Sequence, residues 1–380
     1  MSNISRIPFT ELFEKCQAEL VRDKASNVES EAKYKGFINE AYCNDLTLLL
    51  GPVAEDYLRT EAVITTIAEY STGHITVAAA GSSVTGVSSA WTSTNSNGAL
   101  LKATDEEGVY RVAYSASTTL TLSKPTAWVD DAVTLGDYEL KFDRYALASD
   151  FSHMCIDDQN EPESVFYWRG GAKAHLTPLD NGEYDTKFSF AASGTCGEYT
   201  VKWDAGAPYL HPYPIEETAK SLHYNYIPFL TPMMEYTTGY VSSLANAGVA
   251  LVGASTAWNV TSNIDTSTYD YYFRVDADGT GSRSVWYKVY SVGSATTITL
   301  ATAYGGTAIS SGTAANTYTI SRVSRWPNRF DSVLMYLAAM KADPDNNDVS
   351  KWKAVLDLAI PSHKAIDGRR IQGQRGRVIR

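Results

Sequence analysis

The stretch EAKYKGFINEAYCNDLTLLL, residues 31–50, decides the fold prediction. Its large apolar residues recur mostly three and four positions apart, which is the spacing of one helix face. These residues are Tyr34, Phe37, Ile38, Ala41, Tyr42, Leu48 and Leu49. A helix of this kind, about 30 Å long, cannot bury its apolar face alone and needs helical partners. We therefore expect Phe37, Ile38 and Tyr42 to pack in a core, with Gly51-Pro52 ending the helix.

Three other segments have helical periodicity and are candidate partners: residues 8–24, 326–341 and 348–360. A short polar link separates the first of them from the helix at 31–50, so these two should pack as a hairpin. The other two lie near the end of the sequence and should complete the same core. Their expected core residues are Phe330, Leu334 and Trp352.

The sequence between these helices is rich in short apolar alternations, which predict β-strands. Two Ser/Thr/Gly-rich segments, residues 71–137 and 236–321, share three blocks in the same order, and this order favours an internal duplication over convergent low-complexity sequence. The matching blocks are GSSVTGVSSAW (81–91) with GVALVGASTAW (248–258), LLKA (100–103) with YFRV (272–275), and YRVAYSASTTLTL (110–122) with YKVYSVGSATTITL (287–300).

Composition sets the outer limits of the prediction. The chain has 380 residues, 44% of them hydrophobic and 20% charged, which indicates a globular protein of two to four domains. Its net charge of −11 argues against a general nucleic-acid binder. The four cysteines have no paired spacing and are expected to be reduced thiols. Neither a signal peptide nor a membrane span is expected.

Residues that could carry chemistry form no recognised motif. The sequence contains no GxSxG, HExxH or phosphate-binding GxxxxGK[ST] pattern, and its six histidines are scattered. The acidic run that starts at Asp276 has the first spacings of a calcium loop, but Tyr287 stands where the last carboxylate is needed. A plain β-turn is the favoured interpretation there. We therefore expect no enzyme, no cofactor and no metal site.

Tryptophans in the duplicated segments allow two interpretations. Trp91 and Trp258 occupy matching positions of the two copies, as residues of a packed core would, and Trp128 and Trp286 lie nearby in sequence. Core packing is the favoured interpretation. The alternative is a sugar-binding face lined by these four rings.

The end of the chain is its most basic part. Residues 369–380, RRIQGQRGRVIR, carry five Arg and no acidic residue, with apolar residues between them. One interpretation of residues 363–380 is a frayed tail. The other is an arm that adds to a neighbour's sheet or grips an acidic partner, because the planar guanidinium suits carboxylates and phosphates.

Five blocks of the sequence follow one another in a recognisable order: FINEAYCNDL (37–46), EAVITTIA (61–68), YALASDF (145–151), LHYNYIPFL (222–230) and RWPNRF (325–330). This order resembles the head-to-tail adaptor (tail tubular) proteins of tailed bacteriophages. Ala148 departs from the family pattern, in which proline is expected, and the two duplicated β-segments are a further departure.

This resemblance implies a structural protein of the virion, placed in the neck or tail and assembled in the host cytoplasm. Its copies would form a twelvefold ring (a dodecamer) that binds beneath the portal protein and connects the head to tail or collar proteins. Genomic DNA would pass through the lumen during DNA ejection without specific binding, and an acidic body suits that passage. The alternative is a tail-associated receptor- or glycan-binding protein. The implied portal-binding residues are Arg369, Arg370, Ile371, Arg375, Arg377, Val378, Ile379 and Arg380.

The expected fold class is α+β: a helical-bundle adaptor core with a β-rich part, interrupted by two duplicated small all-β insertions. The expected domains are 1–70 (adaptor core), 71–137 (first inserted β-module), 138–235 (β-rich part of the core), 236–321 (second inserted β-module), 322–362 (C-terminal helices of the core) and 363–380 (basic portal-docking arm).

Overall fold

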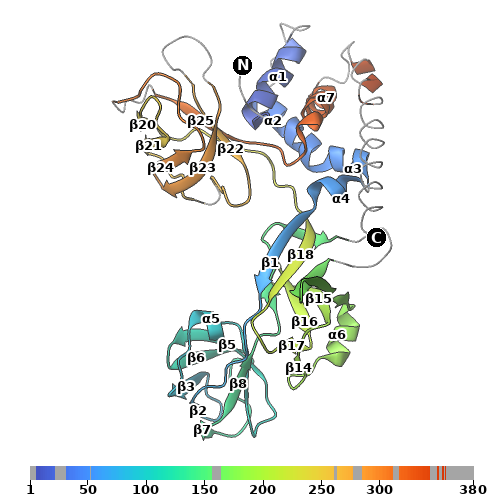
Figure 1. The fold of residues 1–380 in the computed structure, drawn as a ribbon, viewed down its shortest axis with the longest axis vertical. Helices are drawn as coiled ribbons and strands as arrows, with labels where there is room; N and C mark the ends of the chain where they lie inside the picture. The colour runs from blue at the N-terminus through green and yellow to red at the C-terminus, as the bar shows by residue number, and fades with distance from the viewer. Residues whose placement is uncertain are drawn as a thin grey trace. The chain divides into compact units, whose positions relative to one another are not determined.

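The structure is a computed structural model, and the chain in it divides into two compact units (Figure 1). Unit 1 comprises Met1–Leu58 and Leu230–Arg380, and unit 2 comprises Arg59–Phe229. The residues described are 6–21, 31–51, 53–155, 164–260, 263–276, 285–310, 316–342, 349–350, 353–354 and 356.

The expected helical-bundle core is wrong, because the protein is mostly β-sheet. Strands account for 40% of the structure and helices for 22%. The extended buried clusters described below lie in the sheets, where strands distant in sequence bring their apolar faces together. Helical periodicity predicted several helices correctly, but it did not predict where the main apolar cores form.

Unit 1 contains the principal helices. α7 lies against both α1 and α2, and two further helices follow α2 along the chain. In the described part, the predicted last helix at 348–360 is represented by residues 349–350, 353–354 and 356, all helical, and Trp352 lies outside the described residues. The bounds are α1 (Phe9–Val21), α2 (Glu31–Glu40), α3 (Leu46–Leu50), α4 (Val53–Leu58) and α7 (Asp331–Ala342), the last preceded by a 3-10 turn at Asn328–Phe330.

The stretch at 31–50 is not one regular helix. A π-helical turn, Ala41–Asp45, separates α2 from α3, and in it the Leu46 N–H donates to the Ala41 carbonyl. This wider turn rotates the residues after it relative to those of α2. As a result Leu48 is 80% exposed and Leu49 39%, although periodicity alone places both on the buried face.

Unit 2 contains a five-stranded antiparallel sheet in the order β1-β18-β11-β12, in which β10 also pairs with β18. The bounds are β1 (Thr60–Thr65), β10 (Phe151–Met154), β11 (Val165–Arg169), β12 (Ala172–His175) and β18 (Ser221–Pro228). A second sheet has the order β13-β15-β16-β9, and β14 pairs with β17. Their bounds are β9 (Tyr145–Ala146), β13 (Thr177–Pro178), β14 (Ser193–Gly194), β15 (Glu198–Asp204), β16 (Ala207–Tyr213) and β17 (Ile215–Glu216), with α6 (Asn181–Lys187) between β13 and β14.

Each unit also holds one seven-stranded antiparallel sheet. We call the sheet of unit 2 module 1; its order is β7-β2-β3-β6-β5-β4-β8. Its strands are β2 (His74–Val77), β3 (Ser83–Val87), β4 (Leu100–Ala103), β5 (Tyr110–Ala116), β6 (Thr119–Lys124), β7 (Val133–Gly136) and β8 (Tyr138–Lys141), with a helical turn α5 (Ser93–Ser96) after β3.

The sheet of unit 1 is module 2, with the order β19-β25-β22-β23-β24-β21-β20. Aligned through the repeated sequence blocks, β20, β21, β24, β23, β22 and β25 correspond to β2, β3, β6, β5, β4 and β8, so the two sheets share their strand order. The bounds are β19 (Glu235–Tyr236), β20 (Tyr240–Leu244), β21 (Ala250–Ala254), β22 (Tyr271–Val275), β23 (Tyr287–Ser294), β24 (Thr297–Leu300) and β25 (Tyr318–Arg322).

The two modules also share their central hydrogen bonds. The Trp91 indole donates to the Tyr138 hydroxyl at 2.9 Å, and the Trp258 indole donates to the Tyr318 hydroxyl at 2.8 Å. In each case the tyrosine donates onward to a main-chain carbonyl near the start of the module. Common strand order and a common buried pair identify the modules as two copies of one structure.

Candidate functional site

The portal-binding arm predicted from the sequence cannot be placed, because residues 357–380 lie outside the described residues. The predicted core residues Ile38, Tyr42, Phe330 and Leu334 are fully buried in unit 1, whereas Phe37 is half-buried and Lys33 lies over its ring. Tyr42 joins the helices to the segment before α7, since its carbonyl accepts a hydrogen bond from the Trp326 indole at 3.2 Å.

The four tryptophans of the modules are buried: Trp91, Trp128, Trp258 and Trp286. Their exposed fractions are 1, 2, 0 and 7% respectively. A sugar ring stacks on an exposed aromatic face, so these side chains form no such face. This decides the packing question in favour of the core interpretation.

The described residues contain no group of three or more His, Cys, Asp or Glu side chains placed to hold a metal ion. Asp276, the first residue of the calcium-like sequence, accepts a hydrogen bond from Thr319, and residues 277–284 of that loop lie outside the described residues. The four cysteines are free thiols, three of them buried. No helix in the described ranges is long and apolar enough to cross a bilayer.

A buried ion pair joins module 1 to the sheets beside it in unit 2. The Arg111 guanidinium of β5 binds the Asp143 carboxylate at 3.0 and 2.8 Å in a bidentate geometry. His211 of β16 lies 4.0 Å from the same carboxylate. Burial lowers the pKa of His211 to about 4, so the imidazole is neutral at pH 7. Arg111, Asp143 and His211 therefore form a structural network between module 1 and the neighbouring sheet.

Unit 1 has a buried acid of its own at the start of α7. Asp331 is 3% exposed, and burial raises the pKa of its carboxyl to about 7 even though the Ile7 N–H donates to it. A carboxyl near a helix N-terminus is favourably placed as an anion, so burial is the dominant effect here.

One candidate binding surface is the face of the five-stranded sheet in unit 2 that is turned away from the core. The strand register aligns Val63, His223, Phe166 and His175 in one row across β1, β18, β11 and β12. Phe166 stacks on His223 with ring centroids 5.1 Å apart. The opposite face carries residues such as Ile64, Leu222 and Tyr224 and packs into the core of unit 2.

Two further side chains complete this outward face. Trp168 is 55% exposed and meets the edge of Phe166 at 6.1 Å, and the Lys173 ammonium lies 4.0 Å from the centre of the Phe166 ring. Val63 is 53% exposed on the end strand. The Phe166 ring is covered by these neighbours and is 1% exposed, so Trp168 and Val63 supply the exposed apolar surface of this face, which makes it a candidate protein-binding surface. We call this set the outward face: Val63, Phe166, Trp168, Lys173, His175 and His223.

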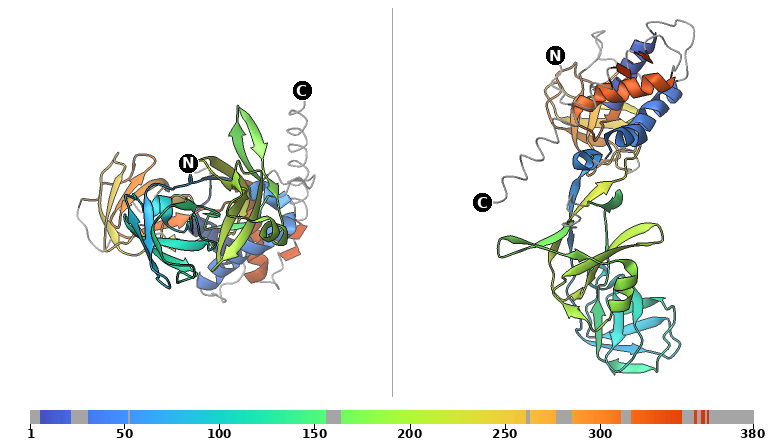
Figure 2. Two further views of the ribbon diagram at one scale, coloured as in Figure 1. Left: turned by 90° about the horizontal axis from the view of Figure 1, so that it is seen from below. Right: turned by 90° about the vertical axis from the view of Figure 1, so that its right-hand side faces the viewer.

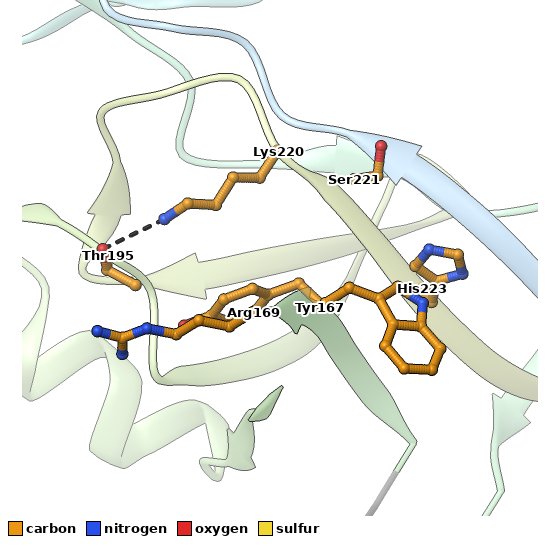
Figure 3. A pocket seen from close by; sticks show the side chains of 7 residues that line it. Tyr167, Arg169, Thr195, Lys220, Ser221 and His223 are labelled. Carbon is orange, nitrogen blue, oxygen red and sulfur yellow. Dashed lines mark hydrogen bonds between the residues drawn. The ribbon is translucent and has the colours of Figure 1, made fainter. Parts of the chain in front are cut away.

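A cavity of about 370 Å³ opens beside the outward face (Figure 3). Lys220 reaches across it and donates to Thr195 at 3.2 Å, while its charge is balanced by Glu216 at 2.7 Å. Arg169 and the Tyr167 ring line the other side. The cavity thus combines an aromatic wall with an exposed guanidinium.

A larger apolar hollow of about 720 Å³ lies elsewhere in unit 2. Trp203 at its rim is 53% exposed, and its indole lies 6.4 Å from the Phe151 ring. Apolar and polar side chains share the wall. The apolar ones include Phe151, Met154, Leu179, Tyr199, Val201 and Trp203, and the polar ones include Ser152, His153, Ser164, Asp180, Asn181 and Thr200.

The outward face was missed by the sequence analysis. In β11, VFYWR, Phe166 and Trp168 lie on one face of the strand and Tyr167 lies on the other. Aromatic residues on both faces indicate that one face packs in the core and the other packs against a partner. The outward face can be recognised only when the strand pairings are known. These pairings join residues about 160 positions apart in the sequence, such as Val63 and His223. No family model matches the chain, and no curated protein matches it significantly.

Proposed function

We propose that this protein is a non-enzymatic structural component of a bacteriophage virion, a head-to-tail adaptor whose copies form a ring between the portal and the tail. The observation that carries the proposal is the outward face of unit 2, where Trp168 and Val63 are about half exposed on a sheet of which β1 and β12 form the ends. A protein that assembles with others keeps such apolar surface for its partners.

Two further features support the proposal. In unit 1 Leu48 and Leu49 project from α3 into solvent, which adds a second apolar surface. In the sequence, five Arg in residues 369–380 contrast with a remainder whose net charge is −16, the difference between −11 and +5. An acidic body favours transit of DNA through a lumen, and a basic, partly apolar end favours docking on a protein partner.

The alternative of a glycan-binding tail protein has less support. The tryptophans of both modules are core residues. The exposed aromatic side chains lie on separate elements, such as Trp168 on β11, Trp203 on β15 and Tyr290 on β23. The outward face around Trp168 carries His175, His223 and Lys173, with few of the amide and carboxylate groups that orient sugar hydroxyls.

Co-purification with the portal protein of the same phage tests the proposal. Native mass spectrometry and negative-stain imaging should show a ring of this protein on the portal, and deletion of residues 364–380 should abolish docking while leaving the circular dichroism spectrum unchanged. The matched control replaces Arg369, Arg370, Arg375, Arg377 and Arg380 by Lys, which keeps the charge but not the planar fork. A full-length protein that never binds portal but binds cells or glycans contradicts the proposal.

A further inference from the structure

The five-stranded sheet of unit 2 has two ends that match each other. Among the strands that the structure describes, β1 and β12 stand at opposite ends of the order β1-β18-β11-β12. Each neighbouring pair is antiparallel, so three successive reversals leave β1 and β12 running in opposite directions. If β12 of one copy lay beside β1 of a second copy, the antiparallel alternation would continue without interruption.

The hydrogen-bond pattern of the ladder fixes which residues face outward at each end. Beyond β1, the Thr66 N–H donates to the Lys220 carbonyl at 2.8 Å, so by alternation the main-chain groups of Glu61, Val63 and Thr65 point away from β18. At the other end the Leu176 N–H donates to the Val165 carbonyl at 2.9 Å, which directs the main-chain groups of Lys173 and His175 away from β11.

Long side chains leave both ends accessible. The Lys173 ammonium folds back over the Phe166 ring, and the Glu61 carboxylate folds back to the His223 imidazole at 2.8 Å. The opposite face near the two ends carries Ala62 in β1 and Ala172 and Ala174 in β12, with the larger Ile64 of β1 packed into the core. Figure 2 shows the β11–β12 hairpin, drawn in green, extending from the body of unit 2. Lysine on an end strand often prevents pairing, but here its side chain lies over the sheet face.

We propose that β12 of one copy adds to β1 of the next copy, so that the partner of these two edges is a second copy of this chain. This inference rests on the proposed ring-forming function. Charge complementarity favours the register in which Lys173 lies directly opposite Glu61, since both residues have outward main-chain groups and side chains on the outward face. Because the two edges differ, the contact is head-to-tail, and a head-to-tail contact closes into a ring when its rotation permits.

Charge reversal at the two edges tests the inference. Glu61→Lys and Lys173→Glu should each abolish ring formation on the portal, because each brings like charges together at every junction. The double variant in one chain should form rings again. An equimolar mixture of the two single variants should also form rings, of even copy number and alternating composition, since each variant then meets only its complement. Uniform ¹⁵N labelling of one of the two variants gives the chains a mass difference large enough for native mass spectrometry to resolve these compositions.

Two controls separate edge pairing from general effects. Glu107→Lys makes the same charge change at an exposed position of module 1 and should leave rings intact. Lys173→Pro removes an outward N–H without removing a bond of the β11–β12 ladder, so it should abolish ring formation even where charge reversal is tolerated. Ala174→Pro removes an inward N–H and serves as the variant that damages the hairpin itself.

The outcomes distinguish this inference from the proposed function. Rings that form equally well from Glu61→Lys, Lys173→Glu and Lys173→Pro overturn the edge-pairing inference while the adaptor function stands. Charge-dependent rings that ignore the portal support edge pairing and contradict the adaptor function. Wild-type protein that stays monomeric with portal present overturns both.

Discussion

The two β-modules share one strand order but differ in what lies beside them. The core of module 1 continues into the neighbouring sheets of unit 2, so that Trp91 and Leu222 belong to one buried apolar cluster. The main core of module 2 is formed from its own strands and loops. Polar bonds are prominent where it meets the helices of unit 1, such as Arg274 with Glu14 at 3.0 Å and the Thr10 N–H with Ser321 at 3.0 Å. Module 1 therefore shares its apolar core with the neighbouring sheets of unit 2, whereas the main core of module 2 is its own.

The largest expected effect comes from truncating the matched tryptophans. Trp91→Ala and Trp258→Ala should each cost about 3–5 kcal/mol, because each leaves a large cavity and removes the hydrogen bond to a buried tyrosine. Their reach should differ. Hydrogen-exchange mass spectrometry should show lost protection in β11 and β18 for Trp91→Ala, whereas Trp258→Ala should lose protection in module 2 and keep it in α7. If both variants lost hydrogen-exchange protection equally far beyond their own module, the distinction between a shared core and a separate core would be wrong.

The second prediction concerns one position that has diverged between the copies. Arg111 on β5 corresponds to Lys288 on β23, but Arg111 binds the buried Asp143 whereas Lys288 pairs with the exposed Asp270 at 2.8 Å. Breaking a buried pair leaves an uncompensated charge, so Arg111→Ala should lower the unfolding free energy by about 3–5 kcal/mol. Lys288→Ala should lower it by less than about 1 kcal/mol. Urea unfolding of the two variants measures both values, and similar losses would contradict the comparison.

These contrasts show where sequence reasoning succeeded and where it stopped. Helices at 8–24 and 326–341 were found because periodicity is local, and the repeated blocks were visible because their order survived. The Trp91–Tyr138 pair, by contrast, joins residues 47 positions apart, and Trp258–Tyr318 spans 60, which no local pattern records. The predicted helical-bundle core failed for the same reason: pairing between distant strands decides where the apolar area gathers.

The candidate site divides in the same way. Composition alone marked the basic end of the chain, because a run of Arg is a local signal. The outward face of unit 2 escaped notice, since it exists only when β1, β11, β12 and β18 are aligned. The exposure of Leu48 also could not be predicted, because a π-helical turn at Ala41–Asp45 rotates it away from the face that regular periodicity assigns.

The third prediction sets the pH dependence of the two units against each other. In unit 2 the pKa of His211 is lowered from 6.5 to about 4, so the unfolded state binds the proton more readily. This group should therefore destabilise unit 2 by up to about 3 kcal/mol as the pH falls from 6.5 to 4. In unit 1 the pKa of Asp331 is raised from 3.8 to about 7, so the folded state binds the proton more readily. Unit 1 should gain up to about 4 kcal/mol from this group over the fall from pH 7 to 4.

Variants isolate these two groups from the other titrating residues. His211→Gln should flatten the acid loss of unit 2, and Asp331→Asn should remove the acid gain of unit 1 while stabilising that unit at pH 8. Hydrogen exchange at pH 5 and pH 8, followed separately in β16 and α7, measures each effect. Acid responses of the same sign in wild-type protein and variant would show that the buried groups do not control them.

The smallest expected effect lies just after the matched tryptophans, where the copies differ in one local feature. In module 1, Thr92 caps the short helix α5: its hydroxyl accepts from the Asn95 N–H at 3.1 Å, and the Asn95 side chain accepts from the Thr92 N–H at 2.7 Å. Thr92→Ala should therefore cost about 1 kcal/mol. The corresponding residue of module 2, Asn259, is exposed in a turn, and Asn259→Ala should change stability by less than about 0.5 kcal/mol. If thermal unfolding gave Asn259→Ala the larger loss, the cap would have no part in the difference between the copies. The merging of module 1 with its surroundings would then rest on its shared core and on the Arg111–Asp143 pair alone.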